Sequence, residues 1–182
     1  MHLLEPEFDP VEVPMSLYVL GTHGVWMTTS FFAAAAIWFL LGFGLARVLP
    51  STSWTKAGLV LFCIAGCGDI VMGVFSVEYP FTPSLTPRTV VHFYGGLAAF
   101  YAIALGSLSF SVSFRRAEQW RPVSTAAIVV SVLMLAMVTT HFQRFPQGMG
   151  GLTQRIAVAL MLLWFGLTVT PWIRSSPVAT AP

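Results

Sequence analysis

Five long apolar stretches dominate the chain, and short polar connections separate them. We expect these stretches to span residues 26–48, 56–77, 90–114, 123–142 and 152–173. Each is close to the length of about 20 residues that a helix needs to cross the hydrocarbon core of a bilayer. The stretches are continuously apolar and lack the period-two alternation of strands. The pattern therefore predicts an all-α, polytopic membrane helix bundle with five transmembrane helices.

Prolines mark the connections between these stretches. The connection that precedes the third stretch carries Pro80, Pro83 and Pro87. Each proline removes a backbone N–H group and disfavours helix at the residue before it. We expect Thr89 to cap the third helix.

Composition supports a membrane protein and excludes several other classes. The chain is 56% hydrophobic and 9% charged, and its formal net charge is only +2. A soluble domain has roughly 25% charged residues, and a disordered chain has a smaller hydrophobic fraction than a soluble domain. The few basic residues form no stripe that would fit a nucleic acid. We therefore expect membrane lipid, and no nucleic acid, as a partner.

The chain divides into three parts by this pattern. Residues 1–25 carry four carboxylates and no Lys or Arg, so they do not resemble a secretory signal peptide. We expect them to form a broken segment that lies on the membrane surface. Residues 26–174 form the single five-helix membrane domain, and residues 175–182 a frayed tail.

Lys and Arg residues predict the orientation, because they concentrate on the cytoplasmic side of membrane proteins. Six of the nine lie in the first connection, the third connection and the C-terminal tail. The other three are Arg88, Arg144 and Arg155. This bias places the N-terminus outside and the C-terminus in the cytoplasm.

Asp69 and His92 are the most informative polar residues, because both fall within predicted spans. A carboxylate inside a membrane is costly unless it is paired, hydrated or protonated. Asp69 therefore either pairs with Arg155, bonds a neighbouring helix, or serves a function. His92 shares a helical face with Gly95, Gly96 and Ala99, and such small residues let another helix approach closely. His92 is thus expected to face the bundle interior, as a structural hydrogen-bonding group or as a ligand.

A metal site is one hypothesis for these groups. His92, His141 and Asp69 have ligand types that zinc accepts, although they would have to converge from separate helices. Haem held between His92 and His141 is a further alternative. The cofactor otherwise stays unknown, with no cofactor as the simplest case.

An anion or lipid-headgroup site is another hypothesis. Arg88 and Arg155, with Gln154 beside them, lie on the predicted outer face. Guanidinium groups bind phosphate and carboxylate well.

Four segments resemble the bacterial membrane family called "domain of unknown function 998" in their order and spacing. They are EFDPVEVPMSLYVLGTHG, GCGDIVMGVFSVEYPFTPSLTPRTVVHFYGGLAAF, SFRRAEQW and GLTQRIAVALMLLW. The resemblance implies functional polar positions at Ser16, Glu78, His92, Gln154 and Arg155. Glu78 stands where the family more usually has an aspartate.

The resemblance also implies a bacterial inner-membrane location and one further helix before residue 1. Either the chain starts earlier than Met1, or the helix is lost, or another membrane subunit or self-association takes its place. The polar residue types are loosely similar to those of intramembrane metal-dependent hydrolases, a group that includes alkaline ceramidases. The late histidine pair of those enzymes has no counterpart here.

Three function classes follow. The first, which we favour, is a non-catalytic accessory, scaffold or lipid-headgroup-binding protein with a polar site on its extracytoplasmic side. The second is a metal-dependent enzyme that acts on a lipid or a lipid-linked substrate, with Asp69, Glu78, His92 and Arg155 as catalytic candidates. The third is a proton-coupled carrier, for which Asp69 is the supporting feature.

Overall fold

The structure is a computed structural model, and it describes residues 3–78, 86–144 and 148–174. These residues form five long helices and one short 3-10 helix, and they include no strand. The long helices are α1 (Gly24–Val48), α2 (Ser53–Val74), α3 (Pro87–Phe114), α4 (Arg121–Arg144) and α5 (Gly150–Arg174). All five are long and apolar enough to cross a membrane, which confirms the predicted fold. The predicted frayed tail, 175–182, lies outside the described residues.

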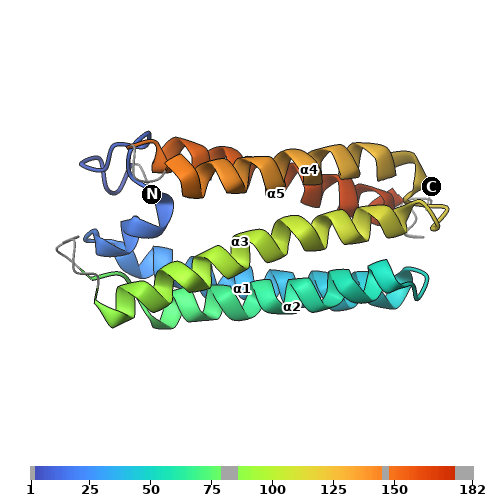
Figure 1. Cartoon of the computed structure of the whole chain (residues 1–182), viewed down its shortest axis with the longest axis horizontal. Helices are drawn as coiled ribbons and strands as arrows, with labels where there is room; N and C mark the ends of the chain where they lie inside the picture. The colour runs from blue at the N-terminus through green and yellow to red at the C-terminus, as the bar shows by residue number, and fades with distance from the viewer. Residues whose placement is uncertain (1–2, 79–85, 145–147, 175–182) are drawn as a thin grey trace, which may run out of the picture.

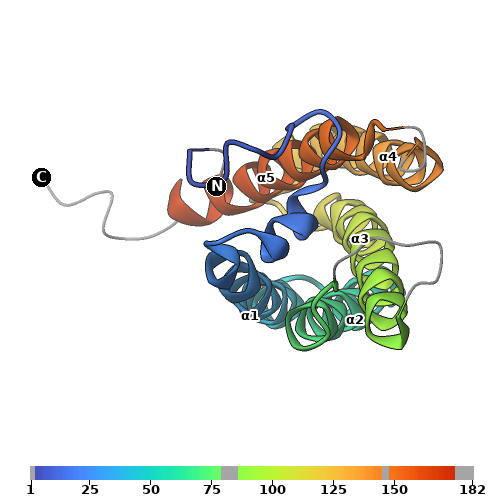
Figure 2. The same ribbon diagram turned by 90° about the vertical axis from the view of Figure 1, so that its left-hand side faces the viewer.

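Helices that follow one another in the chain pack side by side along the long axis of the bundle (Figure 1). Seen end-on, α1, α2 and α3 form one group, and α4 and α5 form another (Figure 2). The 3-10 helix η1 (Met15–Leu20) contacts α1 and α5 at one end of the bundle. We call this end, where residues 3–23 lie, the N-terminal end. The segment predicted to lie on the membrane surface is therefore packed across the helix ends.

Phe62 of α2 is the centre of the core. Its ring is fully buried and meets the rings of Trp38, Phe110 and Trp164 edge-on, at centroid distances of 5.3, 5.2 and 5.7 Å. These partners come from α1, α3 and α5, so one side chain connects four helices. The Trp164 indole N–H also donates a hydrogen bond of 2.8 Å to Ser111 Oγ of α3. In lipid, where apolar surface gives little drive to associate, such packing and hydrogen bonds hold helices together.

Helices α2 and α3 approach each other closely at a pair of glycines, Gly68 and Gly95. A Cβ atom on Gly68 would lie 2.7 Å from the Gly95 carbonyl oxygen and 3.0 Å from Ala99 Cβ. This contact confirms that the small-residue face of α3 allows a neighbouring helix to approach closely. His92, on that same face, is 4% exposed.

The ends of the helices differ from the predicted boundaries by a few residues. Helix α2 ends at Val74, not at residue 77, and α3 begins at Pro87, not at residue 90. Thr86 caps α3, since its side chain accepts from the Thr89 N–H, so the expected cap at Thr89 is wrong. Proline fits the first position of a helix, because a backbone N–H group at that position would have no partner within the helix.

The fold separates the basic residues into the two groups expected from the sequence. Arg88, Arg144 and Arg155 belong to the N-terminal end, and five of the others belong to the described residues near the opposite end: Arg47, Lys56, Arg115, Arg116 and Arg121. The larger group is at the end expected to face the cytoplasm.

The orientation can be measured with fusion proteins. We expect alkaline phosphatase inserted after Gly148, at the N-terminal end, to be active, since that end should be extracytoplasmic. The same enzyme inserted after Ala117, in the third connection, should be inactive. The reversed pattern of activity would show that the orientation is inverted.

The close contact of α2 and α3 can be tested with a pair of glycine variants. Gly68→Ala places a methyl group against backbone, and overpacking of this kind costs about 1–3 kcal/mol. Gly166→Ala is the matched control, because no atom lies within 4 Å of the added Cβ. Thermal unfolding in detergent should show a lower midpoint for Gly68→Ala only. Equal midpoints would contradict the described packing.

Candidate functional site

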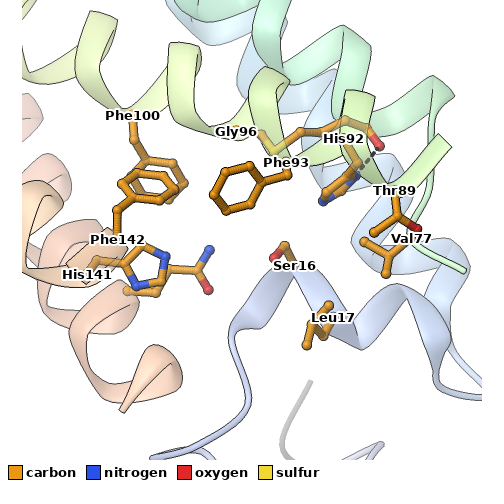
Figure 3. Close-up of a pocket in the computed structure, with 12 residues that line it drawn as sticks. Ser16, Leu17, Val77, Thr89, His92, Phe93, Gly96, Phe100, His141 and Phe142 are labelled. Atoms are coloured by element: carbon orange, nitrogen blue, oxygen red, sulfur yellow. Dashed lines mark hydrogen bonds between the residues drawn. The ribbon is translucent and has the colours of Figure 1, made fainter. Parts of the chain in front are cut away.

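A pocket of about 170 Å³ lies at the N-terminal end of the bundle, between η1 and the ends of the helices (Figure 3). Its polar lining comes from separate elements: Ser16 of η1, Thr89 and His92 of α3, His141 of α4 and Gln154 of α5. The fold thus brings together four residues singled out in the sequence: Ser16, His92, His141 and Gln154. The two histidines stand on opposite sides of the pocket (Figure 3).

His92 joins α3 to the end of α2. Its Nδ1 lies 3.1 Å from the carbonyl oxygen of Met72 and 2.9 Å from that of Phe75. The last carbonyls of a helix have no partner within the helix, so the imidazole satisfies groups that would otherwise be buried unpaired. Carbonyl oxygens only accept, so Nδ1 carries the proton. The ring also packs edge-on against Phe31 of α1, at 5.7 Å.

His141 joins α4 to α5 in a similar way. Its Nδ1 lies 3.0 Å from Thr153 Oγ1, and the Thr153 hydroxyl donates to the Met149 carbonyl at 2.8 Å. Because that hydroxyl proton is already used, Oγ1 accepts from His141, and Nδ1 is again the protonated nitrogen. His141 is 4% exposed.

Gln154 and Arg155 hold the N-terminal segment against the bundle. The Gln154 amide oxygen accepts from the Met15 N–H. The Arg155 guanidinium donates to the Val13 carbonyl at 3.1 Å and to the Tyr18 hydroxyl at 3.1 Å. The sequence predicts an anion site at Arg155, whereas in the structure its guanidinium bonds neutral groups of its own chain.

Aromatic rings form the apolar wall of the pocket on α3 and α4. Phe142 packs against Phe93 at 5.8 Å and against Phe100 at 6.2 Å, both edge-on. Phe93 is 40% exposed, so this wall extends to the outer surface of the bundle. Leu17, Met72 and Val77 complete the apolar lining.

The other predicted site residues do not line this pocket. Asp69 is 5% exposed on α2, and the Trp38 side chain of α1 is the polar group beside its carboxyl. Asp69 thus meets a neighbouring helix, while Arg155 bonds the N-terminal segment. Glu78 is exposed, and its backbone N–H donates to Thr89 Oγ1 at 3.2 Å. Arg88 is exposed and donates to the Val74 carbonyl at 3.0 Å.

No three His, Cys, Asp or Glu side chains among residues 3–78, 86–144 and 148–174 are grouped as metal ligands. Asp69, His92 and His141 are therefore not gathered into one ligand set in this part of the chain. The two histidines are instead used, through Nδ1, to connect helices.

Comparison with known proteins identifies the family. The family model described as "Protein of unknown function (DUF998)" matches residues 1–170. The chain belongs to the DUF998 family. No curated protein and no solved structure matches it. The predicted family is thus confirmed over nearly the whole DUF998 chain.

The aromatic wall of this DUF998 protein is not among the sites predicted from the sequence. Phe93 and Phe100 are seven residues apart, with Gly96 between them, so all three lie on one face of α3. That face lines the pocket. That spacing was a usable signal, although it is also typical of residues that only pack. Thr153 and Tyr18, which hold His141 and Arg155, gave no signal of their own.

Glu5 fixes the start of the N-terminal segment. Its side chain is 1% exposed and accepts from the backbone N–H of His23, whose ring Nδ1 lies 3.2 Å from the carboxylate. The His23 N–H bond holds the pKa of Glu5 below its ordinary value of 4.5, although burial acts in the opposite direction. The carboxylate form therefore stabilises the packed segment.

The stability of this packing should depend on pH. Because the folded state lowers the pKa of Glu5 from 4.5, its stabilising effect is complete above pH 4.5 and is lost as pH falls through the lower, folded value. Thermal midpoints of wild type and Glu5→Gln should differ at neutral pH and converge in acid. Glu12→Gln, at an exposed position, should follow wild type at every pH. A constant difference between wild type and Glu5→Gln would contradict this role.

Proposed function

We propose that this protein is a non-catalytic membrane protein that binds one lipid headgroup in the pocket at the N-terminal end of its bundle. The observation that carries the proposal is the pocket itself, in which side chains from η1, α3, α4 and α5 meet. It is mainly apolar and contains a few polar groups, as is typical of small-molecule sites.

The lining favours an uncharged ligand. None of the described residues that line the pocket is Asp, Glu, Lys or Arg. A charged headgroup buried there would lack a partner of opposite charge, which is costly in an apolar surrounding. The expected ligand is therefore uncharged, unlike the anion first considered for Arg88 and Arg155.

Position also favours a membrane lipid. The pocket lies at the end of a transmembrane bundle, and its Phe93 wall extends to the surface that faces lipid. A headgroup can therefore occupy the pocket while its acyl chains follow the outside of α3 and α4.

A pocket-filling variant tests the proposal. Ser16 points into the pocket from η1 (Figure 3), so Ser16→Phe should fill the space that a headgroup needs. Ser30→Phe is the matched control, because Ser30 is exposed on α1 and adds the same bulk outside the pocket. Native mass spectrometry of the purified proteins should show bound lipid on wild type and Ser30→Phe, and loss of most of it from Ser16→Phe. Equal lipid on all three proteins, each with an unchanged melting midpoint, would contradict the proposal.

A further inference from the structure

We infer that the ligand of this pocket is an acylglycerol with a free hydroxyl group, and that His92 Nε2 accepts a hydrogen bond from that hydroxyl. The inference rests on the proposed function and specifies its ligand class. It depends on the protonation of one buried imidazole and on the polar groups that share the pocket with it.

His92 Nε2 is a buried polar atom without a hydrogen-bond partner among the described residues. The side chain is 4% exposed, so bulk water is not its partner. Figure 3 shows the ring with one nitrogen bonded to backbone and the other turned toward the pocket and Ser16. A buried polar group left unpaired costs about 1–3 kcal/mol, so the atom is expected to be satisfied by a ligand.

The hydrogen bonds of the other nitrogen decide what Nε2 can accept. Nδ1 faces two carbonyl oxygens and must be the protonated nitrogen. The described residues give the ring no carboxylate partner, and an unpaired charge is costly to bury, so the ring is neutral. A neutral imidazole with its proton on Nδ1 offers a lone pair at Nε2. The ligand must therefore present a hydrogen-bond donor there.

Gln154 supplies the opposite chemistry. Its oxygen is used by the Met15 N–H, so the part of the amide that remains for a ligand is the NH₂ group, a donor. His92 thus offers an acceptor and Gln154 a donor among apolar rings, so a ligand that bonds both presents a donor to His92 and an acceptor to Gln154. An acylglycerol carries both, as a hydroxyl group and ester carbonyls, without a charge.

The volume fits a headgroup of this size. A cavity of about 150 Å³ in another protein holds a benzene molecule. The 170 Å³ found here is therefore enough for the glycerol region, with the acyl chains outside. An isolated fatty alcohol would satisfy His92 but would offer Gln154 no carbonyl.

The test is a cycle of two ligands with wild type and one pocket variant, and a control variant is measured beside them. The probes are dioctanoylglycerol and its methyl ether, in which a methyl group replaces the hydroxyl proton and removes the donor. His92→Asn retains a donor near the Nδ1 position and removes the Nε2 lone pair. Thr140→Ala is the control variant, because the exposed Thr140 hydroxyl bonds the Ala136 carbonyl of its own helix. Affinities are measured by titration in native mass spectrometry.

Wild type and Thr140→Ala should bind the alcohol about 10-fold more tightly than the ether, which corresponds to one hydrogen bond to a buried group. His92→Asn should bind both probes equally and weakly, with an unchanged thermal midpoint. Dioctanoyl phosphatidate should bind wild type more weakly than the alcohol, because the pocket offers no cation.

Equal affinity of wild type for alcohol and ether, or tighter binding of phosphatidate, would overturn the ligand class. Tighter binding of octanol than of dioctanoylglycerol would also overturn it. In these cases the proposed function still stands if Ser16→Phe abolishes binding. If no lipid depends on Ser16, the proposed function itself fails.

Discussion

The structure depends on one constraint: the hydrocarbon core of a bilayer offers no hydrogen-bond partner, so a polar group buried in a transmembrane bundle depends on the protein, or on a ligand held by it, for a partner. At the N-terminal end, one end of each of the five long helices meets the segment that contains η1, so the demand for partners is concentrated there. His92 satisfies the last carbonyls of α2, and His141 bonds Thr153 of α5. Gln154 and Arg155 satisfy backbone groups of the N-terminal segment. The residues that make the pocket polar are thus the ones that connect its walls.

This dual use explains why a pocket persists at this end. Each connecting side chain forms its hydrogen bond to another element through one polar atom. That bond fixes the other atoms of the side chain around a space that aromatic rings enclose. For His92, that remaining atom is Nε2, which lacks a partner among the described residues. In the centre of the core, Phe62 instead packs against rings from three other helices. The pocket therefore lies where polar connections replace close packing.

The fold was predictable from the sequence because five apolar stretches of sufficient length allow little else in a membrane. The glycines near His92 also predicted the close approach of α3 to another helix. The site was predictable only in part. His92 and Gln154 were identified as polar residues near one end, but the sequence could not show that Arg155 would bond Val13, more than a hundred residues away. Asp69 was also identified as a polar residue near that end of the bundle. Its position on α2, however, turns its side chain toward Trp38.

The most direct measurement is solid-state NMR of the His92 ring nitrogens in a lipid bilayer, with His92→Asn to assign the signals. The account predicts a neutral ring at neutral pH, with the proton on Nδ1 and an unprotonated Nε2, because Nδ1 faces the Met72 and Phe75 carbonyls. Added dioctanoylglycerol should move the Nε2 signal in the direction of an accepted hydrogen bond and leave the Nδ1 signal in place. A proton on Nε2, or an Nε2 signal that the lipid does not change, would contradict the account.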